Sequence, residues 1–120
     1  MAIGYVTNIT SSNTVRGCRF HHNSDDGLDL WANEGYVLID DCLSYHNGYR
    51  EDGTTHGGDG NGFKFGDVQT SIDAIRKKVI NCVAFDNYDM GFTQNSWTGT
   101  RINACELYNN VAYRNGKVVG

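Results

Sequence analysis

The segment VINCVAFDN, residues 79–87, decides the fold, because close variants of it occur elsewhere in the chain. Each variant has a β-branched residue three positions before a cysteine, an aromatic residue two or three positions after it, and an asparagine five positions after it. The other copies are VRGCRFHHN (15–23), IDDCLSYHN (39–47) and INACELYNN (102–110). Four matched copies in 120 residues indicate an internal repeat.

A second pattern follows the first three copies: GLDL (27–30), GFKF (62–65) and GFTQ (91–94). Its glycine comes four positions after Asn23 and Asn87 but fifteen after Asn47. The second repeat therefore carries an eleven-residue insertion, which includes GYREDGTTHGG (48–58). A further insertion, around DVQTSIDAIRK (67–77), precedes the third cysteine.

The basic unit of about 23 residues contains short alternating pieces rich in Val, Ile, Phe, Tyr and Leu, separated by Asn and Gly. Such pieces are typical of strands joined by tight bends. SIDAIRKKV (71–79) is the one segment that suggests a turn or two of helix. We predict an all-β fold, a single parallel β-helix domain over residues 1–120 with about four to five coils and long loops, in which equivalent residues stack about 4.8 Å apart.

Stacked coils predict two internal columns. Small apolar thiols are commonly buried, so we expect the cysteines to form an inward column of free thiols, with disulfides between stacked neighbours as the alternative. The asparagines would form a column at a bend, each amide bonding the next. The predicted columns are Cys18, Cys42, Cys82 and Cys105, and Asn23, Asn47, Asn87 and Asn110.

Superposing the glycine-led strands predicts a chemical site. Alternation of side chains along a strand places Asp29, Lys64 and Thr93 in one outward column. Asp25 and Asp26 occupy the turn before the same strand. Three converging carboxylates favour a hard cation with oxygen ligands, Ca²⁺ first, and the alternative is a solvated acidic turn. A lysine beside such a cation can serve as a general base, and the alternative is a surface salt bridge to Asp29.

These motifs resemble those of the pectate lyases of polysaccharide lyase family 9. The likeness covers NSDDGLDLW (23–31), DGNGFKFG (59–66), NCVAFDN (81–87) and DMGFTQN (89–95), and more loosely NNVAYRNGK (109–117). The resemblance implies a secreted, right-handed parallel β-helix enzyme that cleaves polygalacturonate or a related acidic polysaccharide by β-elimination. By motif, it makes Asp25, Asp26 and Asp29 the calcium ligands and Lys64 the catalytic base.

The chain departs from this family in length and in one ligand. The enzymes of the family are longer and use a further aspartate from the coil before DDGLD, whereas the sequence near Met1 offers no acidic residue. We therefore expect a central part of a longer β-helix, a calcium site short of one ligand, and self-association through open coil ends. The alternative functions are a non-catalytic module that binds Ca²⁺ or acidic polysaccharide, and a structural or assembly element.

Composition and charge exclude other classes. A net charge of −4 argues against a nucleic-acid partner, and the apolar runs are too short to span a membrane. The first residues, MAIGYVTNIT, lack the pattern of a signal peptide. We read the run at 76–78, Arg-Lys-Lys, as a solvated face. We also disfavour a metal pair at His21 and His22, because neighbouring side chains on a strand point apart.

Overall fold

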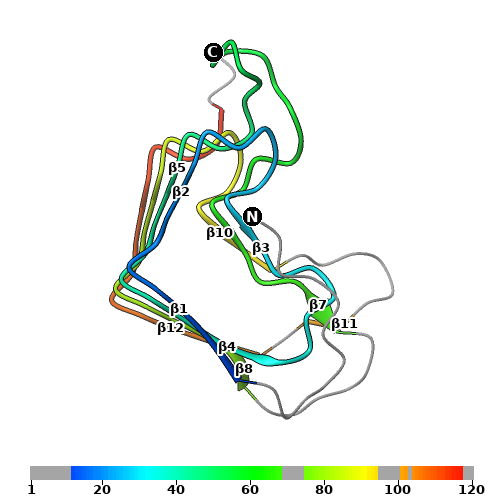
Figure 1. The fold of residues 1–120 in the computed structure, drawn as a ribbon, viewed down its shortest axis with the longest axis vertical. Helices are drawn as coiled ribbons and strands as arrows, with labels where there is room; N and C mark the ends of the chain where they lie inside the picture. Colours follow the sequence, from blue (N-terminus) through cyan, green and yellow to red (C-terminus); the bar gives the residue numbers. More distant parts are fainter. Residues whose placement is uncertain (1–11, 69–74, 95–100, 103, 118–120) are drawn as a thin grey trace.

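The computed structural model describes residues 12–68, 75–94, 101–102 and 104–117, and all the regular elements in these residues are β-strands (Figure 1). The first coil contains β1 (Ser12–Arg16), β2 (Arg19–His21) and β3 (Leu28–Asp29). The second contains β4 (Tyr36–Asp40), β5 (Leu43–Tyr45) and β6 (Phe63–Lys64), and the third β8 (Ile75–Ile80), β9 (Val83–Phe85) and β10 (Phe92–Thr93). β12 (Ala104–Tyr108) and β13 (Val111–Tyr113) belong to a fourth coil, while β7 (Asp67–Val68) and β11 (Arg101–Ile102) form a separate antiparallel pair.

The strands form three parallel sheets, each of which takes one strand from every successive coil. Their orders are β1-β4-β8-β12, β2-β5-β9-β13 and β3-β6-β10. Figure 1 looks down the stack, so the strands of a sheet lie behind one another along the three sides of the coil. This arrangement confirms the predicted parallel β-helix. The described residues contain no helix that could cross a membrane.

Two columns of left-handed residues make the bends on either side of the β2-β5-β9-β13 sheet. A single residue with φ near +55° turns the chain sharply, and Gly, Asn and Asp adopt this conformation at least cost. The bend before this sheet uses those residue types throughout, which explains the Gly and Asn content of the repeat. The residues are Gly17, Asp41, Asn81 and Asn109 at the first bend, and His22, His46, Asp86 and Arg114 at the second.

The interior consists of stacked apolar side chains from the glycine-led strands and their neighbours. Leu28 is in register with Phe63, and Phe63 with Phe92, whose ring centroid lies 5.2 Å away. Leu30 and Phe65 point to the same interior and are almost completely buried. This apolar column faces inward, and it fixes the opposite, outward orientation of the residues between.

The asparagine column runs through all four coils and links them by side-chain amides. Asn23 donates from Nδ2 to Oδ1 of Asn47, Asn47 to Asn87, and Asn87 to Asn115, each over 2.8 Å. The backbone N–H groups of Asn23, Asn47 and Asn87 also donate over 3.2 Å, each to the Oδ1 atom of the next asparagine in the column. Asn47 and Asn87 are buried, so these bonds satisfy amides that water cannot reach.

The fourth coil corrects the register expected from the sequence. Leu107 pairs with Val79 and Val111 with Val83, which places Asn110 level with Cys82. Asn110 accepts a hydrogen bond from the backbone N–H of Cys82, while Cys105 pairs with Lys77 instead. Alignment on the cysteine was misleading, because the true repeat is LYNNVAYRN (107–115), whose VAY matches the VAF of the third coil.

The cysteine column therefore contains three residues, and its thiols are free. Cys42 and Cys82 are buried, and Cys18 is partly buried. Each Sγ donates to a backbone carbonyl of its own coil, at 3.3 Å for Cys42 and 3.2 Å for Cys82. The structure thus has the free thiols expected from the sequence, and Cys105 is also free but lies outside the column.

Strand β8 corrects two further expectations. Residues 75–80 form a strand rather than a helix, and residues 71–74 lie outside the described part of the chain. Within the basic run, Lys77 is not solvated, because strand alternation turns it inward between Val37 and Cys105. Its fully buried Nζ donates to the carbonyls of Asn33 and Gly35, both at 2.8 Å.

Candidate metal and base site

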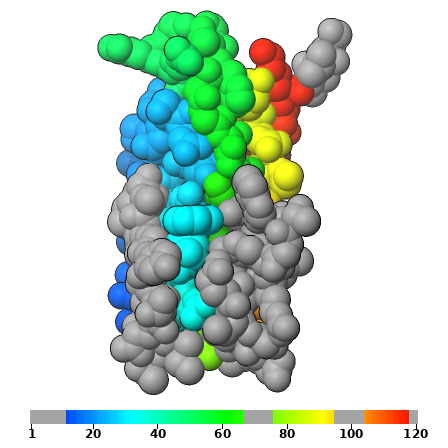
Figure 2. Space-filling view, turned by 90° about the vertical axis from the view of Figure 1, so that its right-hand side faces the viewer, coloured from blue at the N-terminus to red at the C-terminus, as the bar shows by residue number. Residues whose placement is uncertain are grey.

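The outward column predicted for the glycine-led strands is present. Asp29 is in register with Lys64, and Lys64 with Thr93. Figure 2 looks toward this side of the stack, where the cyan and green segments of the first two coils lie side by side beneath a projecting green hairpin. Although Lys64 points away from the core, only 8% of its surface is exposed, because carboxylates and the hairpin enclose it.

Three carboxylates surround the ammonium group of Lys64. Its Nζ lies 2.9 Å from Oδ2 of Asp26, 3.0 Å from Oδ2 of Asp59 and 3.6 Å from Oδ2 of Asp29. Burial acts to lower the pKa of Lys64, but its hydrogen bonds to Asp26 and Asp59 and the charges of Asp26 and Asp29 outweigh burial and raise the pKa above its ordinary value. Lys64 is therefore a protonated cation in this arrangement.

Asp29 occupies the side of the site nearest the first coil. Burial raises its pKa, while the charge of Lys64 and a hydrogen bond from the N–H of Trp31 act in the opposite direction. The bond from Trp31 to Oδ1 is 2.7 Å long and fixes the carboxylate against its own strand. Asp29 is thus an ion-pair partner of Lys64. This is the salt bridge that the sequence left open as the alternative to a general base.

A cluster of three carboxylates with the spacing of a metal site lies beside this ion pair. Asp25, Asp26 and Asp59 each offer an oxygen within 4.8 Å of the others. Asp26 is buried, whereas Asp25 and Asp59 are exposed and accessible to an ion from solution. Hard oxygen donors of this kind fit Ca²⁺. Of the three predicted ligands, the structure groups Asp25 and Asp26, and places Asp29 with Lys64 instead.

The insertion after Asn47 folds into a hairpin that brings Asp59 to this cluster. Tyr49 and His56 form an antiparallel bridge near its base. On the returning arm, Gly58 N–H donates to the carbonyl of Ser24 over 2.5 Å, and Asp59 N–H donates to Oδ1 of Asp25 over 2.6 Å. The loop GYREDGTTHGGDGN therefore contributes directly to the site.

This close approach requires glycine. A Cβ on Gly57 would lie 2.0 Å from the carbonyl oxygen of Ser24, and one on Gly58 would lie 2.3 Å from Oδ1 of Asp25. At Gly57 the neighbour is backbone, so a side chain there would move the hairpin away. At Gly58 the neighbour is the carboxylate of Asp25, so either that side chain or the hairpin would have to shift. The two glycines are thus what allows Asp59 to reach the carboxylates of the first coil.

Asn61 holds the central carboxylate in place. Its backbone N–H and its Nδ2 both donate to Oδ1 of Asp26, each over 2.8 Å. The other oxygen, Oδ2, then faces Lys64. Because Asn61 is only 5% exposed, the orientation of Asp26 is set by protein groups rather than by water.

A depression of about 300 Å³ lies beside Lys64, which is near the lower end of the volumes of ligand pockets. Asp59, Asn61 and Lys64 form one side of it. Asp89, Met90, Thr93 and Gln94 of the third coil form the other. Lys64 therefore borders a space open to a ligand.

The sequence suggested Asp59 as part of a possible functional loop but not as a metal ligand, and it did not indicate Asn61. Both residues belong to DGNGFK (59–64), and their position just before the strand that contains Lys64 was the available signal. Only the folded hairpin shows that Asp59 meets a turn 34 residues earlier. The expectation of a missing upstream ligand concerns residues near Met1, which lie outside the described part of the chain.

Comparison with known proteins agrees with this architecture. The family described as "Pel9A-like, right handed beta helix region" matches residues 2–120. Pectate lyase L of Thermoclostridium stercorarium is 41% identical over 123 residues, covering 97% of this chain and 9% of the relative. Pectate lyase L of Paenibacillus polymyxa is 38% identical (97% and 26%), and pectate lyase PEL9 of Emericella nidulans is 39% identical (88% and 29%).

The chain thus spans less than a third of the length of each of these relatives. No solved structure matches it significantly. The family match extends over nearly every residue, and the coils, the asparagine column and the parallel sheets are those of a β-helix. The chain belongs to the Pel9A-like family of right-handed parallel β-helices.

Proposed function

We propose that this chain forms the catalytic part of a calcium-dependent pectate lyase, which cleaves polygalacturonate or a related polyuronate by β-elimination. The observation that carries the proposal is the position of Lys64, enclosed by carboxylates and bordering a ligand-accessible depression. The names of the relatives, pectate lyases from bacteria and a fungus, support the substrate class. An extracellular location belongs to the same proposal.

In this proposal Asp25, Asp26 and Asp59 hold Ca²⁺, and Asp29 lies close enough to join them through a small movement from Lys64. Calcium would neutralise the uronate carboxylate and stabilise the negative charge that develops when the neighbouring C–H bond breaks. The acidic protein and the acidic substrate are then compatible. Asp25 and Asp59, which are exposed, are the ligands that can face the substrate.

Lys64 is the proposed base. Once its carboxylate partners are withdrawn, Nζ would first lose its own proton to water. The neutral amine would then accept the C5 proton of the uronate, after which the C4–O bond breaks and the leaving sugar oxygen takes a proton from water. Asp26 and Asp59 serve both Lys64 and the proposed metal, so filling the metal site would withdraw carboxylate oxygens from Nζ. The shared carboxylates therefore link occupation of the site to release of the lysine.

The test is turnover of polygalacturonate in the presence of Ca²⁺, followed by the ultraviolet absorbance of the unsaturated product. Lys64→Ala and Lys64→Arg should each lose about 10²–10⁴-fold in rate, the usual contribution of a general base. Lys78→Ala is the matched control, because Lys78 lies outside this site and pairs with Glu106. Equal rates for the wild-type chain and Lys64→Ala would exclude Lys64 as the base.

A second candidate is a module that binds Ca²⁺ or polyuronate without turnover. The observation in its favour is that three carboxylates form ion pairs with Lys64 and raise its pKa, which keeps the amine protonated. Calorimetric titration separates the two functions. Calcium binding by the wild-type chain without product formation would support the module, whereas binding with Lys64-dependent product formation would support the lyase.

A further inference from the structure

A pair of imidazoles lies on the outer surface at the second bend of the first coil, away from the carboxylates around Lys64. Nδ1 of His21 and Nδ1 of His22 are 2.9 Å apart. The sequence suggested that neighbouring side chains would point apart, and this expectation is wrong. His21 ends β2, but His22 has a φ of 54°, so the left-handed bend returns its side chain to the same side.

Each ring of the pair is supported by a second aromatic ring. His21 stacks on Tyr45 of the second coil, with centroids 4.9 Å apart and planes within 10°. His22 stacks on His46, 5.4 Å away and within 24°. The coil spacing therefore holds both imidazoles in place while their edges stay exposed to solvent. A surface pair so supported loses less side-chain freedom when it binds a ligand.

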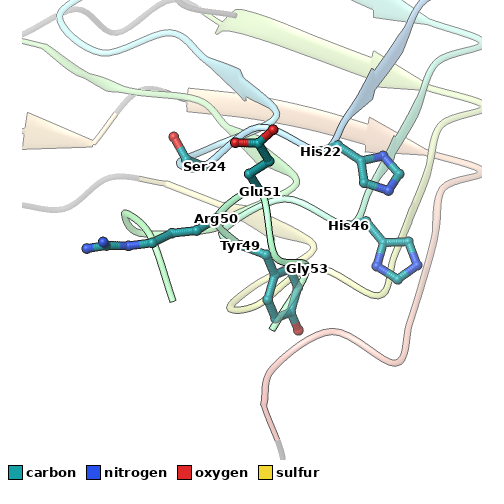
Figure 3. Close-up of a pocket in the computed structure, with 7 residues that line it drawn as sticks. All are labelled: His22, Ser24, His46, Tyr49, Arg50, Glu51 and Gly53. Atoms are coloured by element: carbon teal, nitrogen blue, oxygen red, sulfur yellow. The ribbon is translucent and has the colours of Figure 1, made fainter. Parts of the chain in front are cut away.

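A cavity of about 530 Å³ opens beside the pair (Figure 3). Figure 3 shows His22 and His46 one above the other on the same side of this cavity. Tyr49, Arg50 and Glu51, from the outgoing arm of the hairpin, line the rest together with Ser24 and Gly53. The cavity gives water and small ions access to His22, which is the member of the pair that lines it.

We propose that His21 and His22 form a bidentate site for a tetragonal transition-metal ion, Cu²⁺ or Ni²⁺. Two nitrogens that each lie about 2.05 Å from a metal are about 2.9 Å apart when the angle at the metal is 90°, but about 3.3 Å apart at a tetrahedral angle. The observed separation of 2.9 Å is that of a hydrogen bond, and it leaves the two nitrogens close enough to bind one ion at a right angle. Right-angled nitrogen coordination is typical of Cu²⁺ and Ni²⁺, and tetrahedral coordination of Zn²⁺.

Metal binding at this pair needs a shift of one hydrogen and a rotation of the two exposed rings, because the hydrogen-bonded nitrogens point at each other rather than at a common ion. In the structure one Nδ1 must carry a hydrogen and the other must accept it. In the complex both Nδ1 atoms bind the metal, and the donor ring carries its hydrogen on Nε2 instead. Both rings stay neutral, no proton is released, and water occupies the remaining positions.

The imidazole pair and the carboxylate cluster differ in donor chemistry, so they select different ions. Carboxylates of Asp25, Asp26 and Asp59 suit Ca²⁺, whereas imidazoles suit Cu²⁺ and Ni²⁺ and bind Ca²⁺ poorly. The inference is independent of the proposed lyase function, because Lys64 contributes nothing to the pair.

The experiment is a Cu²⁺ titration of the chain, prepared without a histidine tag and with excess Ca²⁺ present to occupy the carboxylates. Electron paramagnetic resonance and calorimetry report the ligand nitrogens and the affinity. We expect one Cu²⁺ per chain with hyperfine coupling to two nitrogens. His22→Asn, which tolerates the left-handed bend, and His21→Phe, which keeps the stacking on Tyr45, should each weaken binding at least tenfold.

His56→Phe is the control, because His56 lies on the returning arm of the hairpin and stacks on Tyr88. It should bind Cu²⁺ like the wild-type chain, as should Lys64→Ala. Unchanged affinity in both His21→Phe and His22→Asn would overturn the proposal, as would coupling to one nitrogen only. Circular dichroism of every variant establishes that a loss of binding is not a loss of fold.

Discussion

Oδ2 of Asp26 lies 2.9 Å from Nζ of Lys64, while Oδ1 of the same carboxylate accepts two hydrogen bonds from Asn61. Both members of the ion pair are nearly excluded from water, with side-chain exposures of 1% and 9%. One carboxylate therefore joins the first coil to the second and orients the lysine. Changes at either end of this contact should affect stability and metal binding together.

Replacing Asp26 by Asn should destabilise the metal-free chain. The amide still accepts from Asn61 but cannot neutralise Lys64, so we expect a loss of about 2 kcal/mol in the free energy of unfolding. Urea denaturation in the presence of a chelator measures it. Asp86→Asn removes an exposed ion pair with Arg114 and should cost no more than about 1 kcal/mol. Equal losses in the two variants would contradict the structural role of Asp26.

Replacing Gly58 by Ala should weaken calcium binding. The added Cβ would lie 2.3 Å from Oδ1 of Asp25, so either the carboxylate of Asp25 turns away or the hairpin moves with Asp59. Both changes separate the carboxylates of the cluster. We expect at least a tenfold rise in the Kd for Ca²⁺, measured by calorimetry. Gly53→Asn is the control, since a Cβ at Gly53 meets no neighbouring atom and Asn tolerates its positive φ. Unaltered affinity in Gly58→Ala would remove Asp59 from the metal site.

Asn87→Ala should be among the most damaging substitutions in the stack. Asn87 donates to Asn115 and to the carbonyl of Ser44, and accepts from Asn47. Alanine leaves these buried groups without partners, at a cost of about 2–4 kcal/mol. Thermal unfolding should show a lower Tm, whereas Asn109→Gly, at an exposed left-handed bend, should change it little. A small effect at Asn87 would mean that the column contributes little to stability.

Buried Lys77 should make stability depend on pH. Burial lowers the pKa of Lys77 from 10.5 to about 8, because a neutral amine keeps two N–H groups for its two carbonyl acceptors without burying a charge. Between these pH values the unfolded chain binds more protons than the folded one, so the free energy of unfolding rises with pH. The expected gain from pH 8 to 10.5 is about 3 kcal/mol.

Denaturation at several pH values measures this slope, with Lys77→Met as the reference. The methionine variant retains the background from tyrosines and other groups but lacks the contribution of the buried amine. If both chains show the same dependence on pH, Lys77 is charged in the folded protein and the two carbonyls suffice to stabilise its charge.

Periodicity explains which parts of this architecture the sequence could predict. The outward column of Asp29, Lys64 and Thr93 and the first three members of the asparagine column follow from matching short repeats, because each coil places equivalent residues in register. The site residues that depend on the insertion do not repeat. Asp59 reaches Asp25 only because two glycines allow the hairpin to approach, which no single-strand pattern encodes.

The predicted register of the fourth coil and the predicted solvent exposure of Lys77 were wrong for a different reason. Cysteine was given more weight than the Val-Ala-aromatic pattern, although the fourth coil uses Asn110 where earlier coils use a thiol. Lys77 was treated as solvent-exposed because of its charge. Its position in the strand turns the side chain inward instead, and two backbone carbonyls of a neighbouring turn accept hydrogen bonds from its buried amine.

The neck of the hairpin has a practical consequence. Gly48 and Gly60 lie against each other where the chain leaves and rejoins the coil, and Asn47 and Gly62 on either side remain in register with their neighbours. The outer part of this segment, residues 49–56, is therefore an exchangeable cassette, and we expect its length and sequence to vary without shifting the coils as long as Gly57, Gly58 and Asp59 are kept. Such a cassette offers a place to graft new binding specificity onto the β-helix while its scaffold stays unchanged.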